Sequence, residues 1–260
     1  MEIFAIANWK MQLNEAESMS LAKEVVRLWA GQGAEVSELK VVLCPSHVSL
    51  NEVSEAIHGT PIELGAQDVF WEDRGAFTGE VSPVTLKERG CRYCIVGHSE
   101  RRQYLSETDE MVRHKVAALM RHDINPVLCV GETFEEREAG RRDAVVIGQV
   151  RAALEDIRPV GNQRLIIAYE PRWVIGTGTA VQPDDAASMH YLINETLREL
   201  YPEDVVERQC AVIYGGSVDS GNVKDFIASP VIQGVLVGGA ALKAAEFVRM
   251  LEVAADASRA

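Results

Sequence analysis

The chain of 260 residues carries 39 acidic against 26 basic side chains, a formal net charge of -13, and 47% of its residues are hydrophobic. Such a chain can bury a substantial core, and its charge argues against nucleic acid or an anionic membrane as a partner. No run of about 18 apolar residues occurs and the first residues lack the basic region of a signal peptide, so we expect a cytoplasmic protein.

Short apolar or β-branched runs recur along the chain, with helical segments between them. The expected strands are residues 3–7, 41–44, 62–64, 93–96, 126–130, 165–169, 211–214 and 234–237. Helical periodicity marks residues 15–30 after the capping residue Asn14, residues 108–121 and residues 183–200. Strand and helix alternate without a linker or a change in composition. This pattern predicts a parallel sheet closed into a (β/α)8 TIM barrel, with residues 1–260 as a single domain.

The five cysteines are odd in number, and four of them lie in or beside apolar runs. Buried free thiols are therefore expected in preference to disulfides. Cys91 and Cys94 have the spacing of half a zinc or redox site, but no second cysteine or histidine pair accompanies them. Side chains three apart on a strand also point to opposite faces. We expect no metal ion and no redox function there.

Chemically unusual residues gather where the expected strands end, and a TIM barrel carries its active site at that end. They are Asn8-Trp9-Lys10, Gly97 to Arg102, Gly131-Glu132, Glu170, Tyr214 to Ser217, and Gly238-Gly239. Taken singly, each has an ordinary structural explanation, but together they predict one site. The glycine pairs after the last two strands occupy the position where barrels bind phosphate through backbone N–H groups. The expected substrate is a small phosphate ester.

Glu170 follows a buried strand and is succeeded at once by Pro171 and a loop containing Gly176 and Gly178. A glutamate at a strand end is most often a solvated charge. The loop changes that interpretation, because Trp173 supplies apolar matter that could close over a ligand and the glycines let a backbone N–H approach an anion. We interpret Glu170 as a general base beneath a lid spanning residues 171–181.

An aldose–ketose isomerisation needs a base that carries a proton between adjacent carbons and an electrophile that serves the two oxygens. Glu170 suits the first role and His98 the second. His98 comes directly before Ser99 and Glu100, where a helix can begin, and the N–H groups of a helix start oppose a cationic imidazole. His98 is therefore expected to act as a neutral acid.

The phosphate of such a substrate needs local positive charge, because the net charge of the chain repels it. Lys10 would supply a cation, and the binding groups would be backbone N–H groups near Gly176, Ser217, Gly238 and Gly239. No metal ion or organic cofactor is needed, because the carbon acid lies beside a carbonyl.

Seven stretches of the chain resemble the triosephosphate isomerase family, in family order and at family spacing. They are ANWKM (7–11), GAFTGEVSP (75–83), IVGHSERR (95–102), VGE (130–132), AYEPRWVIGTG (168–178), YGGSV (214–218) and GVLVGGA (234–240). The resemblance implies interconversion of dihydroxyacetone phosphate and D-glyceraldehyde 3-phosphate through an enediolate, a step of glycolysis and gluconeogenesis. It implies Glu170 as base, His98 as electrophile, Lys10 as cation and Asn8 as a positioning group.

Four positions depart from the usual family pattern and concern support of the site rather than its chemistry. Ala7 stands in place of Gly, Val174 in place of Ala, Thr179 in place of Lys and Ala241 in place of Ser. Thr179 leaves the rate of lid closure open, and Ala241 removes a hydroxyl beside the phosphate-binding turn.

The stretch 68–80 is too long for an ordinary connection between a strand and a helix. Its aromatic side chains are Phe70, Trp71 and Phe77. A solvated loop would not keep them exposed, so we expect a partner surface; the alternative is that they fold back on their own barrel. By resemblance the chain is a homodimer, in which Thr78 of the partner subunit lies beside Asn8 and Lys10.

Two other functions stay open at this stage. A sister isomerase for a four-carbon sugar phosphate would keep the base, the electrophile and the phosphate site while changing the lid and the depth of the pocket. The intact GTG and LVGGA stretches favour the triose. A non-catalytic barrel that binds a phosphate metabolite as a sensor or scaffold would be expected to lose Glu170 or His98, and both are present.

Overall fold

The strands of the computed structural model, which describes residues 2–30, 39–174 and 180–257, form one closed barrel in chain order. Each strand is parallel to the next, and the last pairs with the first. The strands are β1 Ile3–Asn8, β2 Leu39–Cys44, β3 Glu63–Ala66, β4 Tyr93–Val96, β5 Asn125–Val130, β6 Leu165–Tyr169, β7 Cys210–Tyr214 and β8 Gly234–Val237. The expected closed (β/α)8 barrel is confirmed.

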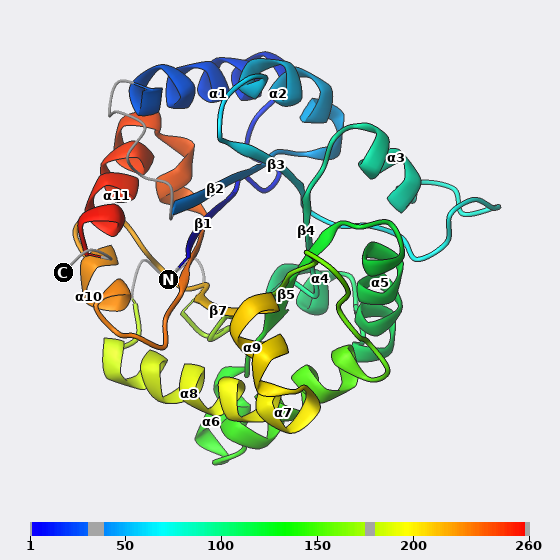
Figure 1. Cartoon of the computed structure of the whole chain (residues 1–260), viewed down its shortest axis with the longest axis vertical. Helices are drawn as coiled ribbons and strands as arrows, with labels where there is room; N and C mark the ends of the chain where they lie inside the picture. Colours follow the sequence, from blue (N-terminus) through cyan, green and yellow to red (C-terminus); the bar gives the residue numbers. More distant parts are fainter. Residues whose placement is uncertain (1, 31–38, 175–179, 258–260) are drawn as a thin grey trace.

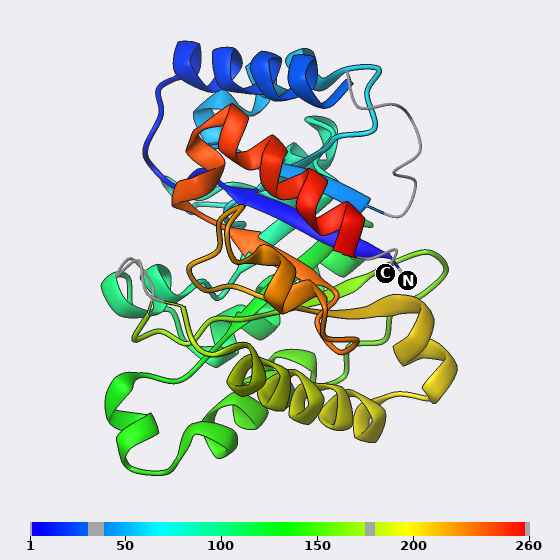
Figure 2. The same ribbon diagram turned by 90° about the vertical axis from the view of Figure 1, so that its left-hand side faces the viewer.

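Helices surround the barrel as an outer ring, seen along the axis in Figure 1 and from the side in Figure 2. They are α1 Glu15–Ala30, α2 Leu50–Ile57, α3 Pro83–Glu88, α4 Ser99–Tyr104, α5 Asp109–Arg121, α6 Phe134–Glu138, α7 Arg142–Leu154, α8 Pro183–Leu200, α9 Glu203–Gln209, α10 Val223–Ile227 and α11 Ala244–Ala257. Two short 3-10 turns join them, η1 His47–Ser49 and η2 Gly239–Leu242. None of the described helices is long and apolar enough to cross a membrane.

Local sequence signals set most element boundaries where they were expected. Before α1, the Asn14 side chain accepts the Glu17 N–H at 2.9 Å and the Glu17 carboxylate accepts the Asn14 N–H at 2.9 Å. This reciprocal cap fixes the start of the helix. The third strand was predicted at residues 62–64 but runs over residues 63–66. Its end is built from small residues, and a Cβ at Gly65 would lie 2.5 Å from the Cys44 sulfur, so a search for bulky apolar runs misses it.

Alternate strand residues fill the inside of the barrel, while the others pack against the helices. The inner cluster consists of Phe4, Ile6, Val42, Cys44, Tyr93, Ile95, Val127, Cys129, Ile166, Ala168, Ala211, Ile213 and Leu236. Asn8 continues the inward row of β1, and Glu170 continues that of β6, because side chains of a strand alternate with period two. The core therefore aims both polar groups at the mouth of the barrel.

All five cysteines are buried and free, as the sequence predicted. Strand alternation was predicted to point Cys91 and Cys94 to opposite faces, which is wrong because Cys91 precedes β4. Cys91 and Cys94 both lie in the layer between the barrel and the helices. Within the described ranges, no group of three or more histidine, cysteine, aspartate or glutamate side chains could hold a metal ion.

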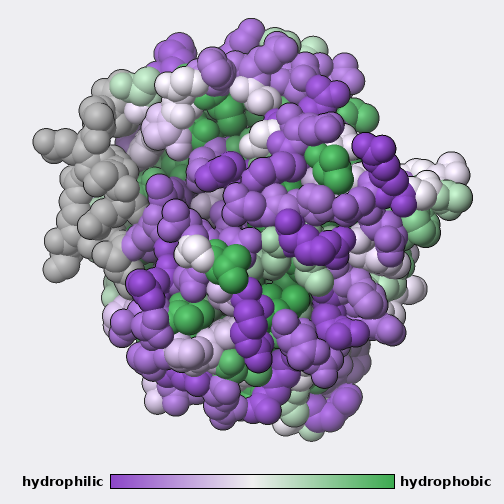
Figure 3. Space-filling view, turned by 45° about the vertical axis from the view of Figure 1, so that its right-hand side comes forward, coloured by the Kyte–Doolittle hydropathy of each residue, from purple (hydrophilic) through white to green (hydrophobic). Residues whose placement is uncertain are grey.

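The stretch 68–80 projects from the barrel beside α3 in Figure 1, and Figure 3 shows it as a pale and green protrusion on a mostly polar face. Two arrangements were expected for its aromatic residues, exposure toward a partner surface or packing against their own barrel, and both occur. Phe70 is buried and stacks on Trp71, with ring centroids 4.1 Å apart, and it packs at a tilt against Phe77, with centroids 4.6 Å apart. Phe77 stays 43% exposed. One aromatic ring thus folds back on its own barrel, and the tip remains open to solvent.

Candidate active site

A cavity of about 650 Å³ opens where the strands end. The predicted site residues that line it are Asn8, Lys10, His98, Glu170, Ser217, Gly238 and Gly239. Ser99 and Glu100 lie behind His98 and Glu170 and bond to them, as described below. Thr78 is exposed on the projecting stretch. Gly176 and the tip of the predicted lid, residues 175–179, lie outside the described residues.

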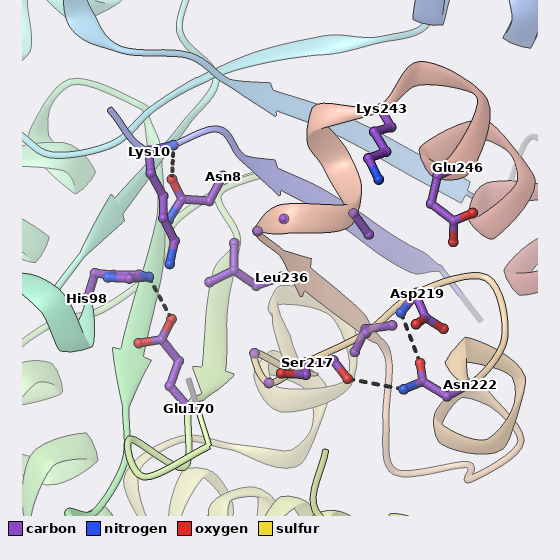
Figure 4. Close-up of a pocket in the computed structure, with 16 residues that line it drawn as sticks. Asn8, Lys10, His98, Glu170, Ser217, Asp219, Asn222, Leu236, Lys243 and Glu246 are labelled. Carbon is purple, nitrogen blue, oxygen red and sulfur yellow. Dashed lines mark hydrogen bonds and ion pairs between the residues drawn. The ribbon is translucent and has the colours of Figure 1, made fainter. Parts of the chain in front are cut away.

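Glu170 is held at the end of β6, where its backbone N–H donates to the Val130 carbonyl at 2.7 Å. The side chain is almost fully buried, yet its carboxylate faces the cavity. Oε1 lies 3.2 Å from His98 Nε2, and Oε2 accepts the Ser99 N–H at 3.0 Å. A Cβ at Gly215 would come within 2.8 Å of Glu170 Cγ, so this glycine leaves the room that the carboxylate occupies. Figure 4 shows the contact with His98.

The His98 ring is oriented by the start of α4, for which His98 is the N-cap. Its Nδ1 accepts the backbone N–H of Glu100 at 3.2 Å. A ring nitrogen that accepts a hydrogen bond carries no proton, so the single proton of the neutral ring sits on Nε2. That proton points to Glu170 and the cavity. With Nδ1 accepting, Nε2 is the ring nitrogen that can donate toward Glu170.

Lys10 adopts a left-handed backbone conformation with φ of 52°, which is uncommon for a residue with a side chain. Two contacts hold it there. Its N–H donates to Asn8 Oδ1 at 3.0 Å, and the Gln67 side chain donates to its carbonyl at 2.9 Å. The ammonium reaches Glu100 Oε1 at 2.6 Å, and a Cβ at Gly238 would lie 3.4 Å from Lys10 Cε. The cation is thereby fixed between His98 and the glycine turns.

The turns after β7 and β8 form the opposite wall of the cavity. Ser217 follows the first, and its carbonyl accepts the Asn222 side chain at 3.1 Å. The second leads through Gly238 into η2, whose first N–H groups have no partner within the turn, as at any helix start. Ala241, which stands where the family has Ser, is buried and donates its N–H to the Gly238 carbonyl at 3.0 Å.

Glu132 is a functional candidate that the sequence reasoning placed at a strand end without giving it a role. Its fully buried carboxylate accepts the Tyr169 hydroxyl at 3.2 Å and the Trp173 indole N–H at 3.0 Å. Arg137 lies 3.7 Å from the same carboxylate and 4.8 Å above the Trp173 ring. Burial, and then the Glu132 charge, raise the pKa of Tyr169. The cluster fixes the segment that follows Glu170. In the sequence, the sign of this role was a carboxylate two residues after the end of β5.

Tyr214 holds the far side of the same segment, and it too was placed at a strand end without a role. Its hydroxyl accepts the Val181 N–H at 3.3 Å, and its ring stacks on Phe226 at 4.3 Å. Burial raises the pKa of Tyr214 to about 12. A Cβ at Gly216 would overlap the Tyr214 hydroxyl at 2.0 Å, so the second glycine of the turn is needed for this contact. Both described ends of the predicted lid are thus anchored on strand-end residues.

A buried ion network lies behind the site and joins the projecting stretch to α4 and α5. Lys115 Nζ contacts Asp68 Oδ1 at 2.7 Å and the Glu107 carboxylate. Arg101 Nη2 contacts Asp68 Oδ2 at 2.8 Å, and its Nε lies 3.4 Å from Glu107 Oε2. Burial raises the pKa of Asp68, although Lys115 and Arg101 act against it. This network ties the helix that carries His98 to the root of the stretch.

A parallel barrel in which a carboxylate and an imidazole meet at the mouth, opposite two glycine turns suited to phosphate, has the site of a barrel isomerase for phosphorylated substrates. A family model described as triosephosphate isomerase matches residues 3–254. Relatives named triosephosphate isomerase come from Roseiflexus sp. (strain RS-1), 48% identical with 94% of each chain covered, and from Caldanaerobacter subterraneus subsp. tengcongensis, 46% identical over 94% of this chain and 96% of the relative. One from Chloroflexus aurantiacus is 44% identical over 94% of this chain and 96% of the relative.

The chain belongs to the triosephosphate isomerase family. The resemblance seen in the sequence is confirmed, and so is the expectation of an intramolecular aldose–ketose isomerase.

Proposed function

We propose that Glu170 is the base and His98 the acid with which the chain interconverts dihydroxyacetone phosphate and D-glyceraldehyde 3-phosphate. The observation that carries this assignment is the contact of Glu170 Oε1 with His98 Nε2 at 3.2 Å at the mouth of the cavity. A substrate carbon placed beside Glu170 would have its adjacent oxygens within reach of the His98 Nε2 proton. Glu170 would then transfer the proton on carbon, and His98 the proton on oxygen.

The reaction would follow from these positions. Glu170 removes a proton from the carbon next to the carbonyl, and the enediolate is stabilised by the Nε2 proton of His98 and the ammonium of Lys10. His98 moves a proton between the two oxygens, and Glu170 returns its proton to the neighbouring carbon. To do so Glu170 must give up the Ser99 N–H, which it accepts here at 3.0 Å. Asn8 fixes Lys10 through the hydrogen bond at 3.0 Å.

The phosphate group would bind at the glycine turns, to backbone N–H groups near Ser217, Gly238 and Gly239, with Gly176 closing over it. The open N-terminus of η2 supports this position. Lid closure would exclude water and prevent loss of phosphate from the enediolate. The free, buried cysteines support an assignment to the cytoplasm, whose thiols are kept reduced.

The test is a coupled assay of the purified protein on glyceraldehyde 3-phosphate and on the four-carbon erythrulose phosphates, side by side. We expect kcat/KM to favour the triose by at least about tenfold, because the phosphate turns and the base fix the length of the substrate. A higher kcat/KM for the four-carbon sugar phosphate would change the assigned substrate and leave the assigned mechanism unchanged. Tight phosphate binding without turnover of either substrate would favour the sensor or scaffold.

We also propose a homodimer held by residues 68–80, with Thr78 of the partner subunit beside Asn8 and Lys10. Two observations support it: the stretch projects from the barrel with an exposed tip, and apolar side chains are exposed on nearby strand-end segments. These are Met11, Val48, Tyr104 and Leu105. Exposed apolar residues around a catalytic rim fit a covered surface.

Sedimentation of the wild type beside a variant with residues 70–77 replaced by a short polar turn tests the dimer. We expect a dimeric wild type and a monomeric variant of much lower turnover, because the partner contact would brace Asn8 and Lys10. A wild type that sediments as a monomer at micromolar concentration with full activity would exclude this role.

A further inference from the structure

The cavity extends beyond the glycine turns to an outer wall that the proposed reaction does not use. Its charged members are Asp219, Lys243 and Glu246. Figure 4 shows Lys243 and Glu246 on the other side of the cavity from Lys10 and His98. A substrate coming from solvent would meet this outer wall on its way to the turns.

The two carboxylates of the outer wall are already engaged. Glu246 Oε1 accepts the Ser220 N–H at 2.8 Å, and this hydrogen bond is the main reason why the pKa of Glu246 lies below its ordinary value. Asp219 Oδ1 accepts the Gly221 N–H at 2.8 Å. Asp219 is thus oriented by its own backbone turn, and Glu246 by the segment that follows β7.

Lys243 differs from Lys10 in making no direct ion pair within the described residues, although its charge contributes to lowering the pKa of Glu246. It directly follows η2, its side chain is exposed, and no hydrogen bond or ion pair joins its ammonium to any residue in the described part of the chain. Lys10 is bound to Glu100 at 2.6 Å. Of the two lysines that line the cavity among the described residues, only Lys243 has an ammonium without a hydrogen bond or a direct ion pair.

A cation at this place affects how the electrostatic field of the molecule acts on an approaching substrate. A chain with a formal charge of -13 repels a phosphate dianion at long range, and local cations at the mouth of a cleft can offset that repulsion. Field lines concentrate in a cleft, so one unpaired cation there acts more strongly than one on an open surface.

We propose that Lys243 is an entry cation, which attracts the phosphate of the anionic substrate and passes it to the turns at Gly238 and Ser217 without taking part in the chemistry. The inference rests on the proposed function, because it assumes that a phosphorylated substrate reaches these turns. Lys243 should therefore affect association and leave the catalytic step alone.

The experiment compares Lys243→Met with Lys224→Met. Lys224 is an exposed lysine of α10 that does not line the cavity, and it also has no partner among the described residues, so the two variants change the net charge equally. For Lys243→Met we expect kcat/KM to fall about five- to tenfold at about 10 mM ionic strength, and to approach wild type at about 0.5 M, with kcat changed less than about twofold. Lys224→Met should change kcat/KM less than about twofold. Lys243→Arg should restore most of the loss.

A binding measurement separates failure of this inference from failure of the proposed function. Inorganic phosphate should bind Lys243→Met several-fold more weakly than Lys224→Met at low salt, and this difference can be measured by calorimetry even if the protein did not turn over triose phosphates. Equal phosphate affinity and equal kcat/KM in the two variants would overturn the inference. So would a fall in kcat as large as the fall in kcat/KM and independent of salt.

Discussion

The two ends of the barrel treat charged side chains in opposite ways. At the end where the strands begin, Glu2 contacts Arg164 and lies 3.6 Å from Lys40, and Arg92 lies 3.9 Å from Glu63. These side chains are between 24% and 58% exposed. Pairs of this kind contribute little to stability, because water already solvates both partners. This end closes the barrel and makes few demands on geometry.

At the end where the strands finish, several charged groups are buried. Glu170 and Glu132 are 2% and 0% exposed, and Lys115 is 2% exposed in its network with Asp68. Burying a charge costs several kcal/mol unless its partners are well placed, so stability alone would not favour collecting charges here. We infer that this end of the barrel is organised to hold charged side chains in a fixed geometry for chemistry. The predictions below test that difference.

The largest effect is expected from Glu170→Gln. The amide keeps the volume of the side chain but cannot accept the proton, so kcat should fall by about 10³-fold or more. Glu63→Gln removes a carboxylate at the opposite end and should leave kcat within about twofold. The coupled assay measures both. A Glu170→Gln variant that retains more than about a tenth of wild-type turnover would rule out the assigned base.

The next effect concerns stability. Lys115→Met leaves the buried carboxylates of Asp68 and Glu107 without their ammonium, so the free energy of unfolding should fall by about 3–5 kcal/mol. Arg92→Met, at the exposed end, should change it by less than about 1 kcal/mol. Urea unfolding at one fixed protein concentration compares them. Equal losses in the two variants would remove the distinction between the two ends.

Stability should also depend on pH through His190, whose ring edge packs against Tyr169 with centroids 6.0 Å apart. Burial lowers the pKa of His190 from 6.5 to about 4. The unfolded chain therefore binds the proton first as pH falls, and the folded state loses stability between pH 6.5 and about 4, by up to roughly 3 kcal/mol.

His190→Gln should flatten that slope in urea unfolding measured across the range. His114, a histidine of α5 whose side chain is 45% exposed, provides the matched control, and His114→Gln should keep the wild-type slope. If the two variants gave the same slope as wild type, another group would account for the pH dependence.

The sequence predicted the parts of the molecule that depend on local patterns. Apolar runs and caps gave the barrel and most boundaries, and the position of His98 directly before a helix was also read from the chain. What the sequence could not give depends on distant segments meeting. The partners of Lys115 lie 47 and 8 residues away, and the strained backbone of Lys10 is held by Gln67 across 57 residues. Such pairings are visible only once the chain is folded.

The central claim is that backbone geometry at the strand ends keeps His98 neutral, with its one proton on Nε2 facing the base. Nitrogen-15 NMR of the histidine-labelled protein at neutral pH, with His98→Gln to assign the signal, measures this directly. The account predicts one protonated nitrogen, Nε2, and a bare Nδ1 that accepts the Glu100 N–H. A proton on Nδ1, or protons on both nitrogens, would contradict it.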